Sequence, residues 1–408
     1  MKIAVVKTVH IAPAALREKG LEHQYYGVAV MDVNTAYCRE KGPDLIQIYA
    51  SLVGSDTSGR YYQRFSADNG RSWSEPTVLY EAKKNGAGVV RWHEGCLFLD
   101  EEKNALLHFN DYSFYPSGHF SKDALHFARI LMRLSFDGGR TFGGPEQIIE
   151  EGHDEIHWAE GVKYGENQMI ISFAAPFKTS TGRILLPVTR LPNPDGYPDP
   201  WCLPEEAGCF IGEWRGDKLQ WRLSRMVGID PKLSSRGLCE PTFAELADGT
   251  LLMVMRGSNT SITHLPGYKW QARSSDSGYT WTEAEPWTYE TNGNFFSPAT
   301  GSRLIRHSVS GRLYWIGNIS PVNPDGNQPR FPLLIAEVGR QSGLPIETET
   351  AVIDDRQETE TEAVQLSNFR VYEDRQTHEF VLNMARIFER GGKDLTSPSY
   401  QYRIRIRD

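Results

Sequence analysis

The sequence lacks long apolar runs and an excess of basic residues. No run reaches the roughly 18 apolar residues of a membrane helix, and the apolar run within Met1–Lys7 is too short for a signal peptide. The 52 acidic residues outnumber the 44 basic ones, which gives a net charge of −8. A broad basic surface for nucleic acid is therefore not expected. We expect a cytoplasmic protein that binds neither nucleic acid nor a membrane.

Cysteine is also scarce. The sequence has five cysteines, at positions 38, 96, 202, 209 and 239, and no two of them form a Cys-x-x-Cys pair. A zinc ribbon or a redox motif is therefore not expected, and the five thiols are expected to be free in a reducing compartment. His153 and His157 stand four residues apart, but the expected strand context argues against a helical metal site. We expect no metal and no cofactor.

Aromatic residues are plentiful by contrast. They make up 11% of the sequence and include 10 tryptophans and 18 tyrosines, which suits both the packing of β-sheets and the stacking of sugars. Hydrophobic residues at 39% and charged residues at 24% exclude a disordered chain. A chain of 408 residues suggests two or three domains, but a closed β-fold can absorb this length as one. We expect one domain over residues 1–408.

A repeat organises the chain. Three segments share the template Ser-x-Asp-x-Gly-x-Ser/Thr-aromatic: Ser66–Trp73, Ser135–Phe142 and Ser274–Trp281. The second begins 69 residues after the first, and the third 139 residues after the second, so a degenerate copy is expected near Glu213–Trp221. In such a turn the aspartate accepts hydrogen bonds from backbone N–H groups of its own turn, and the glycine takes a positive φ. The template predicts tight hairpins with three structural aspartates, Asp68, Asp137 and Asp276.

These repeats resemble the Asp boxes, or bacterial neuraminidase repeats, of the sialidase superfamily. In that family they lie in strand-connecting turns at the periphery of propeller blades. The resemblance implies propeller blades, and repeat units of about 55 to 70 residues with four strands each give six of them over 408 residues. We therefore expect an all-β fold, a six-bladed β-propeller with four-stranded antiparallel blades. The repeat spacing places the blades near residues 25–85, 86–150, 151–228, 229–290, 291–355 and 356–408. The N-terminal strand Ile3–Ile11 is expected to complete the last blade and leave no open sheet edge.

The segment Cys239–Arg256 carries the strongest candidate site. Two apolar strands are joined by Asp248-Gly249, a hairpin signal that returns Arg256 close to Glu240, sixteen residues earlier. Sialidases have a glutamate and an arginine at this spacing in their fourth blade. The resemblance implies that Glu240 is catalytic by activating a tyrosine nucleophile, and that Arg256 binds the substrate carboxylate through its planar fork. The alternative is an ordinary salt bridge.

A second match follows in the fifth blade. Asn318 ends an expected strand, and the segment Asn327–Glu337 resembles the one that carries the third arginine of sialidases. The resemblance implies that Arg330 and Asn318 bind substrate. Two features depart from the family: the Phe/Tyr-Arg-Ile-Pro motif is missing, and Leu366 stands where sialidases have the nucleophilic tyrosine. The chain therefore matches the fold and only part of the catalytic set.

Further acid–base candidates lie in the second and third blades. His93 stands near the start of an expected inner strand, Tyr112 follows its partner strand, and His157 opens the next blade. In a propeller the starts of successive blades point into one central funnel. We therefore predict that His93, His157 and Tyr112 are catalytic groups working near neutral pH. The alternative for each histidine is a structural role.

Three functions fit these residues. The favoured one is a sialidase-like exo-glycosidase that acts on a terminal acidic, carboxylate-bearing sugar of a glycan. The first alternative is a propeller-type polysaccharide lyase, in which arginine neutralises a uronate carboxylate and histidine or tyrosine removes the neighbouring proton. The second alternative is a non-catalytic glycan-binding propeller. The expected partner is an acidic oligosaccharide or glycoconjugate.

Overall fold

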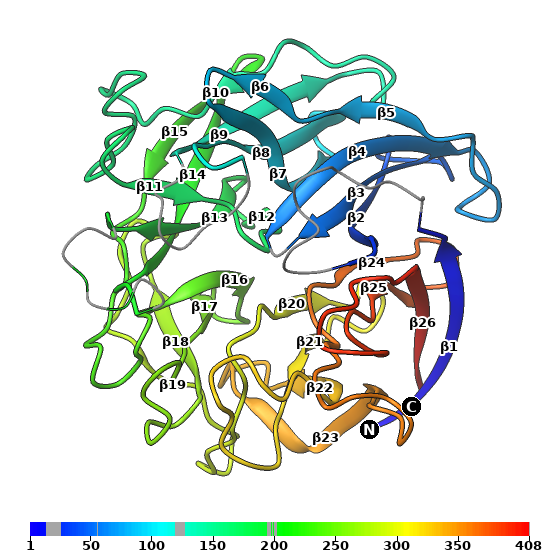
Figure 1. Ribbon diagram of the computed structural model, residues 1–408, viewed down its shortest axis with the longest axis vertical. Helices are drawn as coiled ribbons and strands as arrows, with labels where there is room; N and C mark the ends of the chain where they lie inside the picture. Colours follow the sequence, from blue (N-terminus) through cyan, green and yellow to red (C-terminus); the bar gives the residue numbers. More distant parts are fainter. Residues whose placement is uncertain are drawn as a thin grey trace. The chain divides into compact units, whose positions relative to one another are not determined.

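The computed structural model describes residues 1–13, 26–54, 56–118, 127–193, 197, 199 and 202–407. Regular structure in these residues consists of β-strands, which form six antiparallel sheets of four or five strands each. Figure 1 shows the sheets following one another along the chain. Among the described residues there is no helix long and apolar enough to cross a membrane. The all-β class and the six small sheets predicted from the sequence are confirmed.

The sheets belong to two compact units. Unit 1 comprises residues 1, 127–129 and 148–355, and unit 2 comprises residues 2–126, 130–147 and 356–408. Each unit holds three sheets, apart from residues 127–129 at the start of one strand of unit 2, and each unit is described by itself below. The single domain over 1–408 stays a prediction.

The sheets of unit 2 follow the predicted blade boundaries, except that the second sheet begins at residue 83, before the expected boundary at residue 86. The first contains β2 (Ala29–Tyr37), β3 (Leu45–Gly54), β4 (Thr57–Ser66) and β5 (Thr77–Tyr80). The second contains β6 (Lys83–Asn85), β7 (Gly88–Asp100), β8 (Ala105–Tyr115), β9 (Phe127–Ser135) and β10 (Glu146–Gln147). The third contains β24 (Arg370–Glu373), β25 (Phe380–Ala385), β26 (Ser399–Arg407) and β1 (Lys2–Ile11). Because β1 pairs antiparallel with β26, the N-terminal strand completes the last sheet, as the sequence predicts.

The three sheets of unit 1 also follow the predicted blade boundaries. The first contains β11 (Gln168–Ile170), β12 (Phe177–Lys178), β13 (Ile184–Leu191), β14 (Glu206–Arg215) and β15 (Lys218–Leu223). The second contains β16 (Cys239–Glu245), β17 (Leu251–Arg256), β18 (Lys269–Ser274) and β19 (Glu285–Pro286). The third contains β20 (Arg303–Arg306), β21 (Leu313–Asn318), β22 (Leu333–Val338) and β23 (Pro345–Asp354).

The three repeated turns connect equivalent strands, β4 to β5, β9 to β10 and β18 to β19. In the first turn the backbone N–H of Ser72 donates to Asp68 Oδ1 at 2.8 Å, and Gly70 has a φ of 80°. Asp137 and Asp276 accept equivalent bonds at 2.9 Å. Hydrogen bonds from the turn lower the pKa of Asp68 and of Asp137 to about 2. The predicted structural role of the aspartates is confirmed, and the degenerate copy falls at the equivalent β14–β15 turn.

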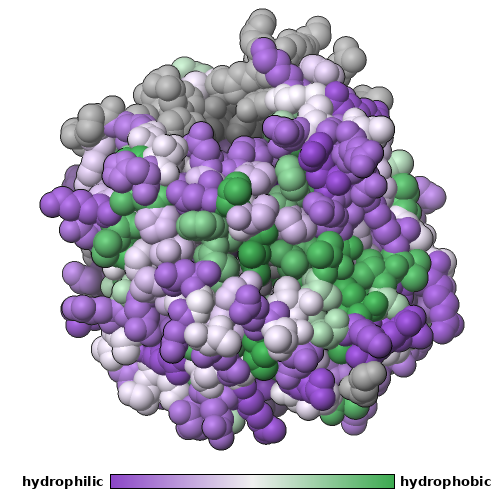
Figure 2. Space-filling view, turned by 90° about the horizontal axis from the view of Figure 1, so that it is seen from below, coloured by the Kyte–Doolittle hydropathy of each residue, from purple (hydrophilic) through white to green (hydrophobic). Residues whose placement is uncertain are grey.

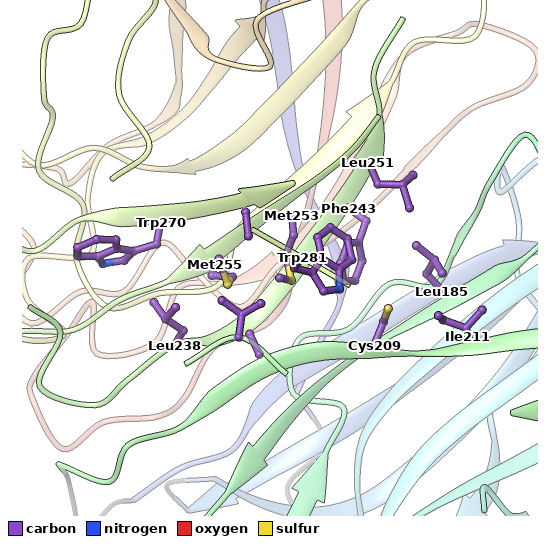
Figure 3. Packing of buried hydrophobic residues seen from close by; sticks show 13 residues of the cluster. Leu185, Cys209, Ile211, Leu238, Phe243, Leu251, Met253, Met255, Trp270 and Trp281 are labelled. Atoms are coloured by element: carbon purple, nitrogen blue, oxygen red, sulfur yellow. The ribbon is translucent and has the colours of Figure 1, made fainter. Parts of the chain in front are cut away.

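The core of unit 1 explains the aromatic residue that ends the third repeat. Trp281 packs on Phe243 with ring centroids 5.4 Å apart, within a buried cluster that Figure 3 shows from close by. Met253 and Met255 of β17 face this cluster, and Leu185 of β13 reaches it from the preceding sheet. The aromatic side chain therefore anchors the turn to the apolar layer between two neighbouring sheets.

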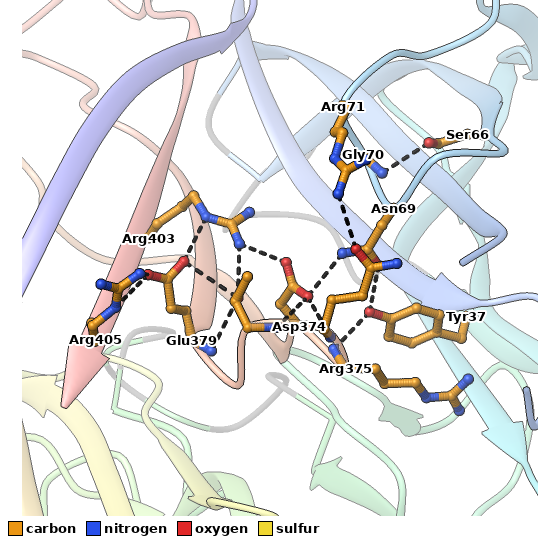
Figure 4. Close-up of polar contacts among 12 residues, drawn as sticks. Tyr37, Ser66, Asn69, Gly70, Arg71, Asp374, Arg375, Glu379, Arg403 and Arg405 are labelled. Atoms are coloured by element: carbon orange, nitrogen blue, oxygen red, sulfur yellow. Dashed lines mark hydrogen bonds and ion pairs between the residues drawn. The ribbon is translucent and has the colours of Figure 1, made fainter. Parts of the chain in front are cut away.

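A polar network ties the first sheet of unit 2 to the third (Figure 4). Tyr37 donates to Asn69 Oδ1 at 2.8 Å, and Asn69 Nδ2 donates to Asp374 Oδ1 at 2.8 Å. Arg403 then pairs with Asp374 at 2.5 Å and with Glu379 at 2.8 Å. These bonds join a repeated turn to the strands of the last sheet, so the sheet interface within unit 2 is polar as well as apolar.

The surface is mixed in character. Figure 2 shows hydrophilic residues over most of one face, with hydrophobic residues gathered in part of it. Exposed large hydrophobic residues include Val6 and Val9 on β1. More than half of a folded protein's surface is apolar in any case, so these residues by themselves indicate no function.

Candidate active site

Glu240 and Arg256 meet through a β-bulge on β16. Cys239 pairs with Arg256 on β17, but the register shifts between Cys239 and Thr242, so that Glu240 lies in the bulge. Glu240 has a φ of 49°, and its backbone N–H donates to Thr189 Oγ1 at 3.0 Å. Arg256 Nη1 donates to Glu240 Oε1 at 2.8 Å. The hairpin predicted from the sequence therefore brings these two residues together, and the bulge directs the carboxylate toward the guanidinium.

The Glu240–Arg256 ion pair is nearly buried, and not all of its polar atoms have a hydrogen-bond partner among the described residues. The side chains of Glu240 and Arg256 are 12% and 11% exposed. Ser172 Oγ also donates to Glu240 Oε1, at 3.3 Å. Glu240 Oε2 and Arg256 Nε have no hydrogen-bond partner among the described residues. Burial raises the pKa of Glu240, but the charge and hydrogen bond of Arg256, together with the charges of Lys269 and Arg330, hold this pKa below its ordinary value.

Asn327 joins Arg256 to Arg330. Its side-chain Oδ1 accepts from Arg256 Nη2 at 3.3 Å, and its backbone oxygen accepts from Arg330 Nε at 3.2 Å. The two arginines predicted to bind a carboxylate therefore share one neighbour. Asn318 is fully buried and donates to the backbone oxygens of Arg330 and Pro332, at 3.2 and 3.0 Å. Asn318 thus holds the segment that carries Arg330.

Lys269 is a charged neighbour that sequence reasoning missed. It lies directly opposite Arg256 on β18 and is fully buried. Its Nζ donates to the backbone oxygens of Thr300 and Pro298, and Arg330 Nη2 donates to that of Ala299 between them at 3.3 Å. Burial, with Arg256 adding to it, lowers the pKa of Lys269 to about 7. Lys269 is the first residue of β18, a strand of mixed polar and apolar residues, so its burial had no signal in the sequence.

A second ion pair completes the charged cluster of unit 1. Arg236 Nη2 contacts Glu205 Oε1 at 2.7 Å, and the Glu205 side chain is 4% exposed. Glu205 and Arg236 both interact electrostatically with Arg256. The cluster therefore holds more cations than carboxylates, with the members Arg236, Arg256, Lys269, Arg330, Glu205 and Glu240.

The structure places His157 away from these residues. His157 is exposed and lies in a turn where Asp154 accepts a hydrogen bond from its backbone N–H at 2.8 Å. The neighbouring Glu150 bridges to Trp221 on β15, the last strand of its sheet. His157 therefore does not begin an inner strand as expected, because the irregular segment after β10 first runs along β15.

His93 and Tyr112 lie in unit 2. His93 Nδ1 contacts Ser58 Oγ at 2.9 Å, and burial lowers the pKa of His93. The Tyr112 ring packs edge-on against Trp92, with centroids 5.0 Å apart. The charged cluster of unit 1 thus contains Glu240, Arg256 and Arg330, supported by Asn318. The catalytic roles of His93, Tyr112 and His157 stay predictions.

The family follows from a comparison with known domains. The model of the BNR repeat-like domain matches residues 61–368. The chain belongs to this family. The match covers three quarters of the chain and runs from within β4 to the segment before β24. No curated protein matches the chain.

Solved structures with similar folds include proteins of different activity. A protein of unknown function from Dyadobacter fermentans is 14% identical, with 99% of each chain covered and a TM-score of 0.65. The intramolecular trans-sialidase of Ruminococcus gnavus is 12% identical, with 93% of this chain and 94% of that chain covered and a TM-score of 0.61. The α-L-arabinanase of Penicillium chrysogenum is 14% identical, with 98% of each covered and a TM-score of 0.54. These likenesses show the fold, a six-bladed β-propeller.

Proposed function

We propose that this member of the BNR repeat-like family is a glycoside hydrolase acting on a glycan with a carboxylate-bearing sugar. Arg256 and Arg330 bind the sugar carboxylate. The observation that carries this proposal is the junction at Asn327, which receives one hydrogen bond from each guanidinium. Similar folds in a trans-sialidase bound to oseltamivir carboxylate and in an arabinanase bound to arabinobiose support a glycan ligand.

The charge around Asn327 favours an anion. The surrounding cluster has more cations than carboxylates, although the whole chain carries a net charge of −8. Arginine binds carboxylates through two parallel N–H donors in a fixed geometry. In a site partly shielded from water such contacts are stronger than they are on the surface. The local excess of positive charge therefore supports binding of an acidic sugar.

Two unsatisfied atoms fit the same ligand. Arg256 Nε is a donor and Glu240 Oε2 is an acceptor, and each lacks a hydrogen-bond partner among the described residues. A buried polar atom without a partner costs about 1–3 kcal/mol. A sugar carboxylate would accept from Arg256, and a sugar hydroxyl would donate to Glu240. In this arrangement Glu240 orients Arg256 and contacts the sugar.

A panel of matched fluorogenic substrates tests the proposal. The panel contains 4-methylumbelliferyl glucuronides and galacturonides, each paired with the glucoside or galactoside of the same anomeric configuration. We expect cleavage of at least one uronide, and at least tenfold slower cleavage of its neutral counterpart. Equal rates on both members of a pair would overturn the acidic specificity, and no cleavage of any member would overturn the hydrolase.

A second experiment distinguishes the two alternatives, a polysaccharide lyase and a non-catalytic glycan-binding protein. Polygalacturonate is incubated with the protein while ultraviolet absorbance and new reducing ends are followed together. An unsaturated, ultraviolet-absorbing product would assign a lyase. Binding of uronide oligosaccharides without any product would assign a non-catalytic glycan-binding protein.

A further inference from the structure

Arg64 of unit 2 is a partly buried cation that is bound by uncharged side chains. It lies on β4, and its Nε and Nη2 donate to Gln47 Oε1 on β3 at 2.9 and 2.6 Å. Its Nη2 also lies 2.9 Å from Nε2 of His10 on β1. Among the described residues no carboxylate forms an ion pair with Arg64. By contrast Arg60, two residues earlier on the same face of β4, pairs with Glu81 at 2.6 Å.

The guanidinium is held in one orientation. Gln47 is fully buried, and its Nε2 donates to Thr35 Oγ1 at 2.8 Å, which turns its Oε1 toward Arg64. The guanidinium carbon lies 4.7 Å from the ring centroid of Trp73 and 5.7 Å from that of Tyr49. A guanidinium that is bound along one edge and stacked against aromatic rings is preorganised, so a ligand that binds it costs little side-chain entropy.

Two nitrogens of this group are open to solvent. Arg64 Nη1 donates to no described residue and is not enclosed by the protein. Because a guanidinium only donates, His10 Nε2 accepts from Arg64, and the imidazole proton lies on Nδ1. Gln47 Oε1, at 3.1 Å from the same Nε2, therefore receives no proton from His10. His10 Nδ1 likewise has no partner in the described part of the chain and is not enclosed.

The electrostatics of this group favour an anion. Burial lowers the pKa of Arg64 to about 10 from an ordinary value of 12.5, and Tyr49 offsets this only in part. Burial, with Arg64 adding to it, lowers the pKa of His10 to about 4, so the imidazole is neutral at neutral pH and accepts from Arg64. A cation removed from water without a charged partner is destabilised. An oxyanion at Nη1 would stabilise it through a charge-assisted hydrogen bond.

Two partly exposed aromatic rings accompany the donors. Trp73 lies against the Arg64 guanidinium, and Tyr62 stacks on Tyr49 with ring centroids 5.2 Å apart. Tyr62 and Arg64 stand two residues apart on β4 and therefore share a face. Aromatic rings beside a few fixed polar groups are typical of small-ligand sites, and they suit the apolar face of a sugar ring.

We propose that Arg64 and His10 form an oxyanion-binding site of unit 2, which takes the carboxylate or sulfate group of an acidic sugar with Tyr62 and Trp73 beside the sugar ring. Arg64 Nη1 and His10 Nδ1 donate to the oxyanion. The site shares no residue with the charged cluster of unit 1, so this proposal does not rest on the hydrolase function.

The test titrates sodium glucuronate, sodium sulfate and glucose against the full chain while tryptophan fluorescence is followed, because Trp73 lies against Arg64. Sodium chloride keeps the ionic strength constant, so the screening of charges does not change during a titration. We expect glucuronate to bind at least tenfold more tightly than glucose, and Arg64→Gln to weaken glucuronate by roughly tenfold or more. Arg60→Gln, on the same face of β4, is the matched control and should bind as the wild type does.

Arg330→Gln separates this site from the cluster of unit 1. Glucuronate binding that Arg64→Gln removes and Arg330→Gln keeps belongs to unit 2 and supports the proposal. Binding that only Arg330→Gln removes would overturn the site in unit 2 and leave the proposed function intact. Sulfate binding as tight as that of glucuronate would keep the oxyanion site but assign it to a free inorganic anion instead of a sugar.

The wild type decides where Arg64→Gln does not fold. The Cε1–H proton signal of His10, assigned with His10→Gln, should move on titration with glucuronate and stay fixed with glucose. An unmoved His10 signal would overturn the proposal and show that Arg64 only joins β1 to the first sheet of unit 2.

Discussion

Lys269 and Arg256 lie directly opposite each other on neighbouring strands, β18 and β17, although both are cations and the lysine is fully buried. Burial and the arginine together lower the pKa of Lys269 to about 7 from an ordinary value of 10.5. The protein therefore holds a lysine that loses its proton near neutral pH, next to the residues proposed to bind an acidic sugar.

Lys269 should make stability depend on pH. Between pH 7 and 10.5 the unfolded chain binds a proton at this site that the folded protein has released, so the free energy of unfolding rises with pH across this window. The total gain is on the order of 5 kcal/mol. Urea unfolding at several pH values should show this rise in the wild type and lose it in Lys269→Met. Lys84→Met, at an exposed position, is the control and should keep the wild-type dependence of unfolding free energy on pH. If the unfolding free energies of wild type and Lys269→Met change with pH in parallel, the prediction is refuted.

Glu240 and Arg256 should depend on each other for stability. Glu240→Gln leaves a buried guanidinium without its partner, which costs about 3–5 kcal/mol. Removing both charges with Glu240→Gln and Arg256→Met should cost less than the two single changes added together. Urea unfolding of the four proteins measures the coupling. The exposed pair Glu151–Arg222 serves as control, and Glu151→Gln should change stability little. Additive single effects would contradict the prediction.

Arg330 should discriminate between acidic and neutral sugars. A charge-assisted hydrogen bond contributes about 1.5–3 kcal/mol, so Arg330→Gln should weaken a uronide by roughly tenfold to a hundredfold and leave the matched neutral glycoside unchanged. Isothermal titration with a uronide oligosaccharide and its carboxyl-reduced form measures both. Arg215→Gln, on the exposed end of β14, is the control. Equal loss for both ligands would mean that Arg330 only supports the fold.

Ordinary sialosides should be poor substrates. Leu366 stands where sialidases have the nucleophilic tyrosine, and it is fully buried. We expect negligible cleavage of 4-methylumbelliferyl sialoside under conditions in which a uronide is cleaved. Turnover of this sialoside at the rate of the best uronide would show that another group of this chain replaces the tyrosine.

Local features were predictable because their bonds are local. In the repeated turns Asp68 and Asp137 bind residues four positions ahead, so the template alone predicts the hydrogen bonds. The hairpin signal at Asp248-Gly249 likewise places Arg256 near Glu240, because the turn determines which strands pair. The number of sheets followed from the spacing of these turns, and Arg330 from the resemblance to a family segment.

The sequence by itself thus determined the all-β class, the six sheets, the turns, and the meeting of Glu240 with Arg256. Tertiary structure decided the rest. Arg370 contacts Asp32 from 338 positions away, and only the closure of the last sheet brings them together. The left-handed backbone at Asp32, Glu94 and Glu240 depends on bulges, which sequence alternation does not reveal. In the sequence Lys269 is an ordinary strand residue, and only tertiary packing buries it. The path of the segment before β11 places His157 beside an outer strand.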